Sequence, residues 1–173
     1  MKGVIIIATK EMVTKKFGED KWKEALKKAG VEKEPELSPV TDVDDKIALA
    51  VIKALCEVLN LSLQEVADAF GEYWIFEYSQ KYYKKYYEGV NNAKDFLLKM
   101  DKVHQAATWS IKGAKPPRFE YEWKDDKTLI MKYKSHRKLI EFMIGLIKAV
   151  GKYFKEDLKV TRLSDTEVEI VFP

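Results

Sequence analysis

Apolar positions in the first half of the chain recur with the spacing of amphipathic helices. The first of these helices is expected to end at Gly18, and a second one follows it directly. After a loop that contains two prolines, a strongly apolar helix is predicted over residues 44–60. Ser62 and Glu65 form a capping box, which places the start of a further helix there. The first half is therefore predicted to be helical.

A longer apolar stripe runs through residues 93–113, in a helix that Asn91 or Asn92 is expected to cap. A glycine and then the pair Pro116-Pro117 prevent this helix from continuing. The stripe places a histidine among residues typical of a core: Phe96, Leu97, Met100, Val103, His104, Ala107 and Ile111. The histidine is therefore expected on the apolar face of the helix.

In the second half the hydrophobic period changes to two, which is typical of strands. Residues 118–123 and 128–133 predict one hairpin, and a helix is predicted over residues 136–154. Residues 157–163 and 167–172 predict a second hairpin. This order indicates an α+β fold, with an N-terminal helical bundle followed by a helix-packed four-stranded antiparallel sheet.

A length of 173 residues suits a single domain, 1–173, divided into a helical subdomain (1–60) and a subdomain that holds the sheet (61–173). The single cysteine, Cys56, excludes an internal disulfide framework, and two histidines exclude multi-histidine metal clusters. Cys56 lies in an apolar helix and is interpreted as an inert structural thiol. The N-terminal apolar run is too short for a signal peptide or a membrane span, so we expect a cytoplasmic protein without membrane insertion.

The net charge of +3 is too small and too evenly spread to indicate nucleic-acid binding. Residues 80–89 interleave tyrosines and lysines, a pattern that either stacks the bases of a single strand or forms an amphipathic helix end. The amphipathic helix end is favoured, because no second segment of basic and aromatic residues would extend a binding surface for a single strand. An aspartate cluster, Asp42, Asp44 and Asp45, lacks the spacing of a calcium loop and is interpreted as helix capping.

Two interpretations of His104 remain open from the residues alone. It is either a hydrogen-bonded core histidine or an axial ligand to a flat apolar cofactor such as haem. A haem also needs cations and hydroxyls for its propionates, and Tyr133, Ser135 and Arg137 alternate in the run YKSHR. His136, between them, is expected to point to solvent. Taken alone, this triplet is more often a solvated strand end.

Four sequence features together resemble one family: the opening MKG, KMDKVH before His104, KGAKPPR after it, and YKSHR. The chain is similar over essentially its whole length to H-NOX domains, the haem nitric oxide/oxygen-binding domains related to the sensor domain of soluble guanylate cyclase. The resemblance implies that His104 is the proximal ligand of a non-covalent b-type haem and that Pro117 presses on the porphyrin. The other cofactor-binding residues that it implies are Tyr133, Ser135, Arg137, Met100, Val103 and Ile5.

The resemblance also implies which gas is bound. Family members that hold dioxygen supply a distal tyrosine, and the matching position here is Phe142, which has no donor. The distal pocket is expected to be largely apolar and to contain Ile5, Thr9, Trp74, Phe142 and Leu146. This favours nitric oxide and carbon monoxide as ligands. The alternative is dioxygen binding that uses another donor, such as the indole of Trp74.

By the same resemblance the chain is a sensor and not an enzyme. Nitric oxide would release His104 from the iron, and the distorted haem would relax and shift the N-terminal helices. The output is expected from a separate signalling protein or a fused domain, such as a histidine kinase, a cyclic-di-GMP enzyme or a chemotaxis receptor. A peroxidase is disfavoured because the expected distal pocket contains no histidine or arginine.

Overall fold

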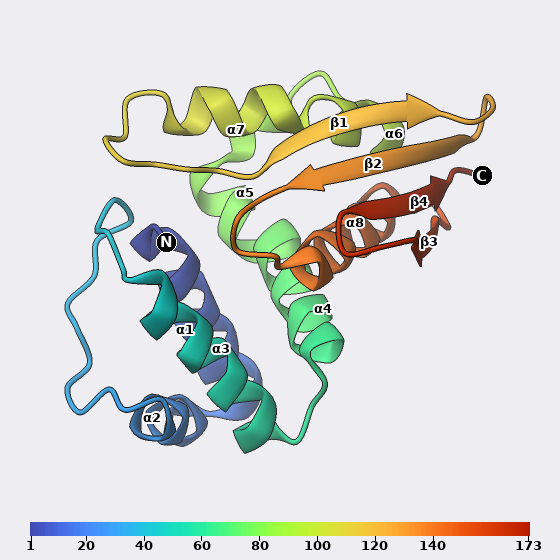
Figure 1. Ribbon diagram of the computed structural model, residues 1–173. Coiled ribbons are helices and arrows are strands. Elements are labelled where there is room, and N and C mark those ends of the chain that lie inside the picture. The colour runs from blue at the N-terminus through green and yellow to red at the C-terminus, as the bar shows by residue number, and fades with distance from the viewer.

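The computed structural model describes all residues from Met1 to Pro173. Its helices α1, α2 and α3 form one group, and α4 lies between that group and the sheet-bearing half (Figure 1). The helical elements are α1 (Gly3–Phe17), α2 (Glu19–Lys28), α3 (Asp45–Leu59), α4 (Leu63–Tyr73), a π-helix (Trp74–Tyr78), α5 (Ser79–Tyr82), a 3₁₀ turn (Lys84–Tyr86), α6 (Ala93–Leu98), α7 (Met100–Thr108) and α8 (Ile140–Phe154).

Helix ends follow the capping signals of the sequence. Gly18, with a φ of 100°, separates α1 from α2 in a conformation that glycine adopts readily. The Asp44 side chain accepts a hydrogen bond from the backbone of Lys46 at the start of α3. The predicted capping box of Ser62 and Glu65 is present at the start of α4.

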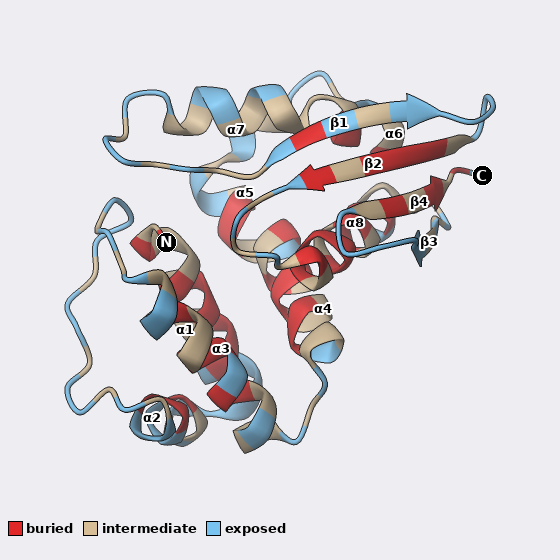
Figure 2. Ribbon diagram, in the orientation of Figure 1, coloured by how far each residue is buried: buried red, intermediate tan, exposed pale blue.

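Four strands form one antiparallel sheet in the order β1-β2-β4-β3, which confirms the predicted α+β class. The strands are β1 (Arg118–Trp123), β2 (Thr128–Lys134), β3 (Lys159–Arg162) and β4 (Glu167–Val171). Leu129 and Met131 of β2 and Ile170 of β4 are buried in the same core as Ile147 of α8. Alternate strand residues thus supply one apolar face, and α8 covers it (Figure 2).

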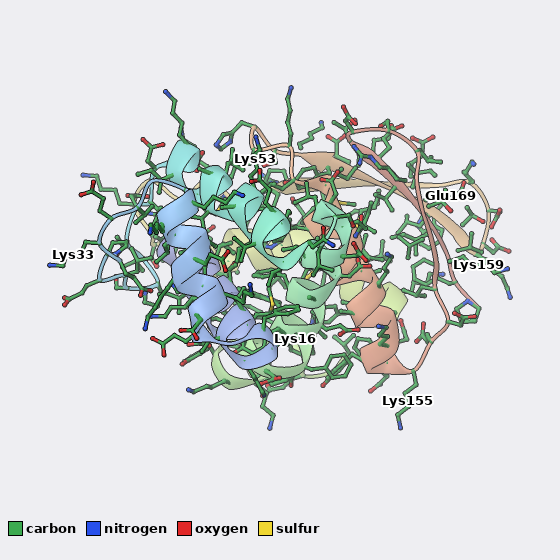
Figure 3. The ribbon with its side chains drawn as sticks, turned by 90° about the horizontal axis from the view of Figure 1, so that it is seen from below. Lys16, Lys33, Lys53, Lys155, Lys159 and Glu169 are labelled. Atoms are coloured by element: carbon green, nitrogen blue, oxygen red, sulfur yellow. The ribbon has the colours of Figure 1, made fainter.

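Helices α4 and α8 cross in contact through two glycines. A Cβ atom added at Gly71 would lie 2.4 Å from the backbone of Gly145, and one added at Gly145 would lie 2.3 Å from the carbonyl oxygen of Ala67. Only glycine permits this approach. The crossing joins two apolar cores: one within α1–α4, and one between α8, the sheet and α6. Charged side chains such as Lys33 and Lys155 extend outward from the surface (Figure 3).

The helix predicted over residues 93–113 is interrupted, so that prediction was wrong in its continuity. It forms α6 and α7, with a break at Lys99. The hydroxyl of Tyr121 donates to the carbonyl of Leu97 at 2.9 Å and accepts from the backbone of Asp101 at 3.3 Å. It therefore replaces the helical hydrogen bond that would join Asp101 to Leu97.

Two other predicted boundaries also differ. Helix α8 begins at Ile140 and not at residue 136. Lys138 has a φ of 53°, which does not occur within an α-helix, and the side chains of His136 and Arg137 bind Asp45. Residues 80–89 form the end of α5 and a 3₁₀ turn, which is close to the favoured helix-end interpretation. No single helix is long and apolar enough to cross a membrane; α3 with the helical run Leu63–Tyr82 meets the length and composition test, but the pair is bent by 104°.

Candidate functional site

A cavity of about 390 Å³ lies between the two halves of the molecule. Its wall is mostly apolar and combines residues from α1, the π-helix, the 82–87 segment, α6, α7 and α8. The predicted residues that line it are Ile5, Trp74, Met100, Val103, His104, Pro117, Arg137 and Leu146. The structure thus brings most of the predicted site together around one cavity.

His104 is the residue on the cavity wall that could bind a metal. Its Nδ1 atom is buried and has no hydrogen-bond partner. Burial lowers the pKa of His104 to about 4, so the imidazole is neutral at physiological pH. The ring lies 5.2 Å from the ring of Phe119. A neutral imidazole on an apolar cavity wall is a suitable metal ligand.

Asp101 holds the helix that carries His104 against the sheet. Its carboxylate accepts hydrogen bonds from Nε and Nη2 of Arg118, both at 2.8 Å, and from the backbone of Phe119 at 2.9 Å. The bonds from Arg118 hold the pKa of Asp101 well below its usual range. Gln105 also donates to this carboxylate, at 2.8 Å. Asp101 makes no hydrogen bond to the Nδ1 atom of His104.

Arg137 supplies a positive charge at the rim of the cavity. Its Nε donates to Asp45 at 2.8 Å and its Nη1 to the carbonyl of Lys115 at 3.0 Å. Ser135 lies beside it, and the Ser135 hydroxyl accepts from the Arg137 backbone at 3.3 Å. Tyr133 belongs to β2 and is buried near Phe119. Neither Ser135 nor Tyr133 lines the cavity in this structure.

The aspartate cluster divides into separate roles. Asp44 caps α3 as predicted, and Asp42 forms an ion pair with Lys2 at 2.8 Å. Asp45, for which only capping was expected, instead binds Arg137, the amino group of Met1 and His136. His136 is exposed, as expected, but its Nε2 lies 2.9 Å from a carboxylate oxygen of Asp45.

Two residues expected in the distal pocket lie behind the cavity wall. Thr9 is fully buried and its hydroxyl donates to the carbonyl of Ile5 at 2.7 Å. Phe142 is buried against Phe70, with 5.2 Å between ring centroids. Phe70 in turn stacks on Trp74 at 5.7 Å, so Phe142 is separated from Trp74 by one aromatic layer.

The tyrosine-rich segment forms a part of the wall that the sequence did not reveal. Tyr83, Tyr86 and Tyr87 line the cavity, and Tyr83 stacks on Trp74 at 5.8 Å. The hydroxyl of Tyr87 hydrogen-bonds that of Ser79 at 2.6 Å. A signal was present, because half-buried tyrosines were expected in this segment, but nothing local showed what they cover.

The residues present fit a haem. The cavity is mostly apolar, the imidazole of His104 on its wall makes no hydrogen bond within the protein, and Arg137 lines the same cavity with a guanidinium that can bind carboxylates. Arg137 uses one Nε and one Nη1 hydrogen for protein acceptors, which leaves three N–H groups for an anion. His104 would hold the iron, and Arg137 the propionates.

Comparisons with known proteins agree with this chemistry. The family model described as Haem-NO-binding matches residues 2–162. The chain is 28% identical to a Cs H-NOX mutant, with a TM-score of 0.85. The match covers 99% of this chain and 96% of that one. It is 29% identical to an oxygen-binding H-NOX domain related to soluble guanylate cyclases, with a TM-score of 0.83 and coverage of 99% and 95%.

Curated relatives include the soluble guanylate cyclase gcy-37 of Caenorhabditis elegans, 25% identical over 171 residues. That match covers 94% of this chain but 24% of the cyclase, so the chain spans about a quarter of the relative's length. The family model, the solved structures and the cyclases all match over nearly the whole chain. The chain therefore belongs to the Haem-NO-binding family and is an H-NOX domain, a haem-binding sensor fold related to part of soluble guanylate cyclase.

Proposed function

We propose that this domain senses nitric oxide, and also binds carbon monoxide, at a five-coordinate ferrous haem b whose axial ligand is His104. The haem iron supplies the gas-binding position. One observation carries the proposal: the neutral imidazole of His104, whose Nδ1 atom is buried, lies on the wall of a mostly apolar cavity and makes no hydrogen bond within the protein. A core histidine without a ligand would instead be expected to hydrogen-bond within the protein.

The remaining wall residues position the cofactor. Arg137 binds the propionates through its free N–H groups, with Tyr133 and Ser135 as further donors once these side chains turn toward the carboxylates. Pro117 lines the cavity and would contact the porphyrin, where the family resemblance gives it the role of distorting the ring. Met100, Val103 and Ile5, all on the cavity wall, supply apolar contacts to the macrocycle.

The distal wall favours nitric oxide and carbon monoxide over dioxygen. Ile5 and Leu146 line it, and Phe142 behind it has no hydroxyl. Bound dioxygen carries partial negative charge and gains more from a hydrogen-bond donor than the other two gases do. Trp74 brings an indole N–H group to the cavity wall, and Tyr83, whose ring stacks on Trp74, brings a hydroxyl to the same wall. Dioxygen binding through such a donor, Trp74 in the first place, is the competing outcome.

We further propose that the signal is the release of His104. If Nε2 held the iron, the Nδ1–H group would have no acceptor, because Nδ1 has no partner and both carboxylate oxygens of Asp101, one turn away, bind other groups. Metal-bound histidines usually gain basicity from such an acceptor, so the His104 bond to iron is expected to be weak. After release, the α1–α3 group shifts relative to the sheet-bearing half.

The output partner is proposed from the family alone: a histidine kinase, a cyclic-di-GMP enzyme, a chemotaxis receptor or a fused output domain, in the cytoplasm. The two halves proposed to move are the subdomains 1–60 and 61–173. Because the cyclases are about four times longer than the match, their catalytic activity is not carried over to this domain.

Absorbance spectroscopy tests the proposal. Protein expressed with sufficient haem should show a Soret band, and His104→Gly should lose the haem or bind it only with added imidazole. Nitric oxide titration of the ferrous protein should give a five-coordinate spectrum; a persistent six-coordinate spectrum would count against His104 release. Wild-type protein without haem would refute the central assignment.

A pair of variants tests the gas preference. Ferrous wild-type protein should bind carbon monoxide and show no stable dioxygen complex in air. Phe142→Tyr adds a donor at the matching family position and should slow dioxygen loss, whereas Phe142→Leu should not. A stable dioxygen complex in the wild type that disappears in Trp74→Phe would establish the alternative.

A further inference from the structure

The YKSHR loop is tied to the N-terminal helices by one carboxylate. Asp45, in the first turn of α3, lies 92 residues from Arg137 in the sequence, yet its Oδ1 accepts from Arg137 Nε at 2.8 Å. Its Oδ2 lies 2.9 Å from Nε2 of His136, and the amino group of Met1 also donates to Oδ1. The N-terminal elements and the loop between β2 and α8 therefore meet at Asp45.

The carboxylate of Asp45 carries the negative charge at this junction. Partial burial alone would raise the pKa of Asp45, but hydrogen bonds from the Met1 amino group, Arg137 and His136 outweigh it and hold the pKa well below its usual range. The Asp45 side chain is 30% exposed and that of Arg137 is 15% exposed, so the pair is partly shielded from solvent. Such charge-assisted bonds are short and directional.

The direction of these bonds fixes the guanidinium. Asp45 takes the Nε hydrogen and the carbonyl of Lys115 takes one Nη1 hydrogen, which orients the planar group from two sides. Three N–H groups on the Nη edge remain for an anion, and Arg137 lines the cavity. An unrestrained arginine would lose considerable rotamer freedom when it binds a carboxylate, and Asp45 removes part of that loss beforehand.

We propose that Asp45 is a positioning residue for the cofactor's carboxylates: it orients Arg137 toward them and so connects the rim of the cavity directly to α3. The inference rests on the proposed haem function. Arg137 then bridges two anions, one from α3 and one from the cofactor. A shift of the cofactor's edge is transmitted to α3 through a single guanidinium group.

Haem loss to an excess of apomyoglobin tests the proposal. Asp45→Asn keeps the shape but not the charge, and should accelerate haem loss by about tenfold, the scale of one lost charge-assisted hydrogen bond. Asp44→Asn is the matched control, since asparagine also caps helices well, and should leave the rate unchanged. Equal rates for wild type and Asp45→Asn would overturn the proposal.

A double-mutant cycle separates positioning from a general loss of stability. In an Arg137→Gln background, Asp45→Asn should produce no further acceleration, because its effect passes through Arg137. An equal acceleration in both backgrounds would indicate a merely structural role and overturn the proposal. Wild-type protein that holds no haem would instead refute the proposed function itself.

The cofactor-free protein gives an independent measurement. The Arg137 Nε–H proton should exchange slowly with solvent in the wild type, because Asp45 accepts from it, and quickly in Asp45→Ala, which has no side-chain acceptor. NMR of isotope-labelled apoprotein measures this directly. Rapid exchange in the wild type would show that Asp45 does not restrain Arg137, and would overturn the proposal without reference to haem.

Discussion

Removal of the Asp101 charge should destabilise the attachment of α7 to the sheet. In Asp101→Asn, the carboxylate that accepts from Arg118, Phe119 and Gln105 becomes a neutral amide with one acceptor oxygen. The Arg118 side chain is 53% exposed, so solvent screens most of its ion pair with Asp101 and the pair contributes little. The bond from the buried Phe119 backbone to a charged acceptor adds about 1.5 kcal/mol. We therefore expect a loss of about 2 kcal/mol near pH 7.

The pH dependence identifies the charge as the cause. The pKa of Asp101 is lower in the folded protein than its unfolded value of about 3.9, so its stabilisation is complete above that value and declines as the pH falls toward the folded pKa. The difference in unfolding free energy between wild type and Asp101→Asn should shrink by about 1 kcal/mol between roughly pH 7 and roughly pH 3.

Urea unfolding of the apoprotein at the two pH values measures both quantities. Asp126→Asn, at an exposed position in the turn between β1 and β2, is the matched control and should change the free energy of unfolding by less than about 0.5 kcal/mol. The reasoning would be refuted if the Asp101→Asn effect were the same at both pH values, or if the control lost as much stability.

Two further outcomes follow from the packing of the helices, and a third follows from the proposed role of His104. Gly145→Ala places a methyl group 2.3 Å from the Ala67 carbonyl and should destabilise the apoprotein by about 1–3 kcal/mol in urea unfolding, although alanine is the better helix former; a gain in stability would contradict the crossing. Tyr121→Phe removes the hydroxyl inserted between α6 and α7 and should cost about 1 kcal/mol, with altered hydrogen exchange at the Asp101 amide; unchanged exchange would contradict the insertion. His104→Gly should regain haem with added imidazole, and recovery without imidazole would contradict axial ligation by His104.

Local patterns predicted the elements because their causes are local. The apolar patterns of residues 118–123 and 128–133, the capping box at Ser62 and the glycine at position 18 depend on neighbouring residues. The strands β1 and β2, the start of α4 and the end of α1 lie where these signals predict them. Continuity across residues 93–113 failed for the opposite reason. The hydroxyl that breaks that helix belongs to Tyr121, 24 residues beyond Leu97, and no periodicity within the helix contains that information.

The residues of the site divide in the same way, into those that local patterns predict and those whose contacts join distant parts of the chain. His104 was predicted as a ligand because it lies on an apolar stripe between recognisable motifs, and Arg137 as a propionate partner because it belongs to the YKSHR triplet. Both line the same cavity. The contact between Asp45 and Arg137 depends on how two halves of the chain dock, and an aspartate at the start of a helix is locally indistinguishable from a cap. Phe142 had the same limit, since its position in the family motif does not specify that Phe70 lies beside it.

The surroundings of His104 connect stability to signalling. The nearest carboxylate, Asp101, could strengthen an iron–histidine bond by accepting from the imidazole, but its acceptor positions face Arg118, Gln105 and the β1 backbone. The same bonds hold α7 firmly to the sheet. In the function proposed above, a rigid helix with a weakly basic ligand would allow the imidazole to leave the iron while the backbone that carries it stays anchored. The movement that follows release is therefore expected in the cofactor and the α1–α3 group, which Asp45 connects to the rim, and not in α7.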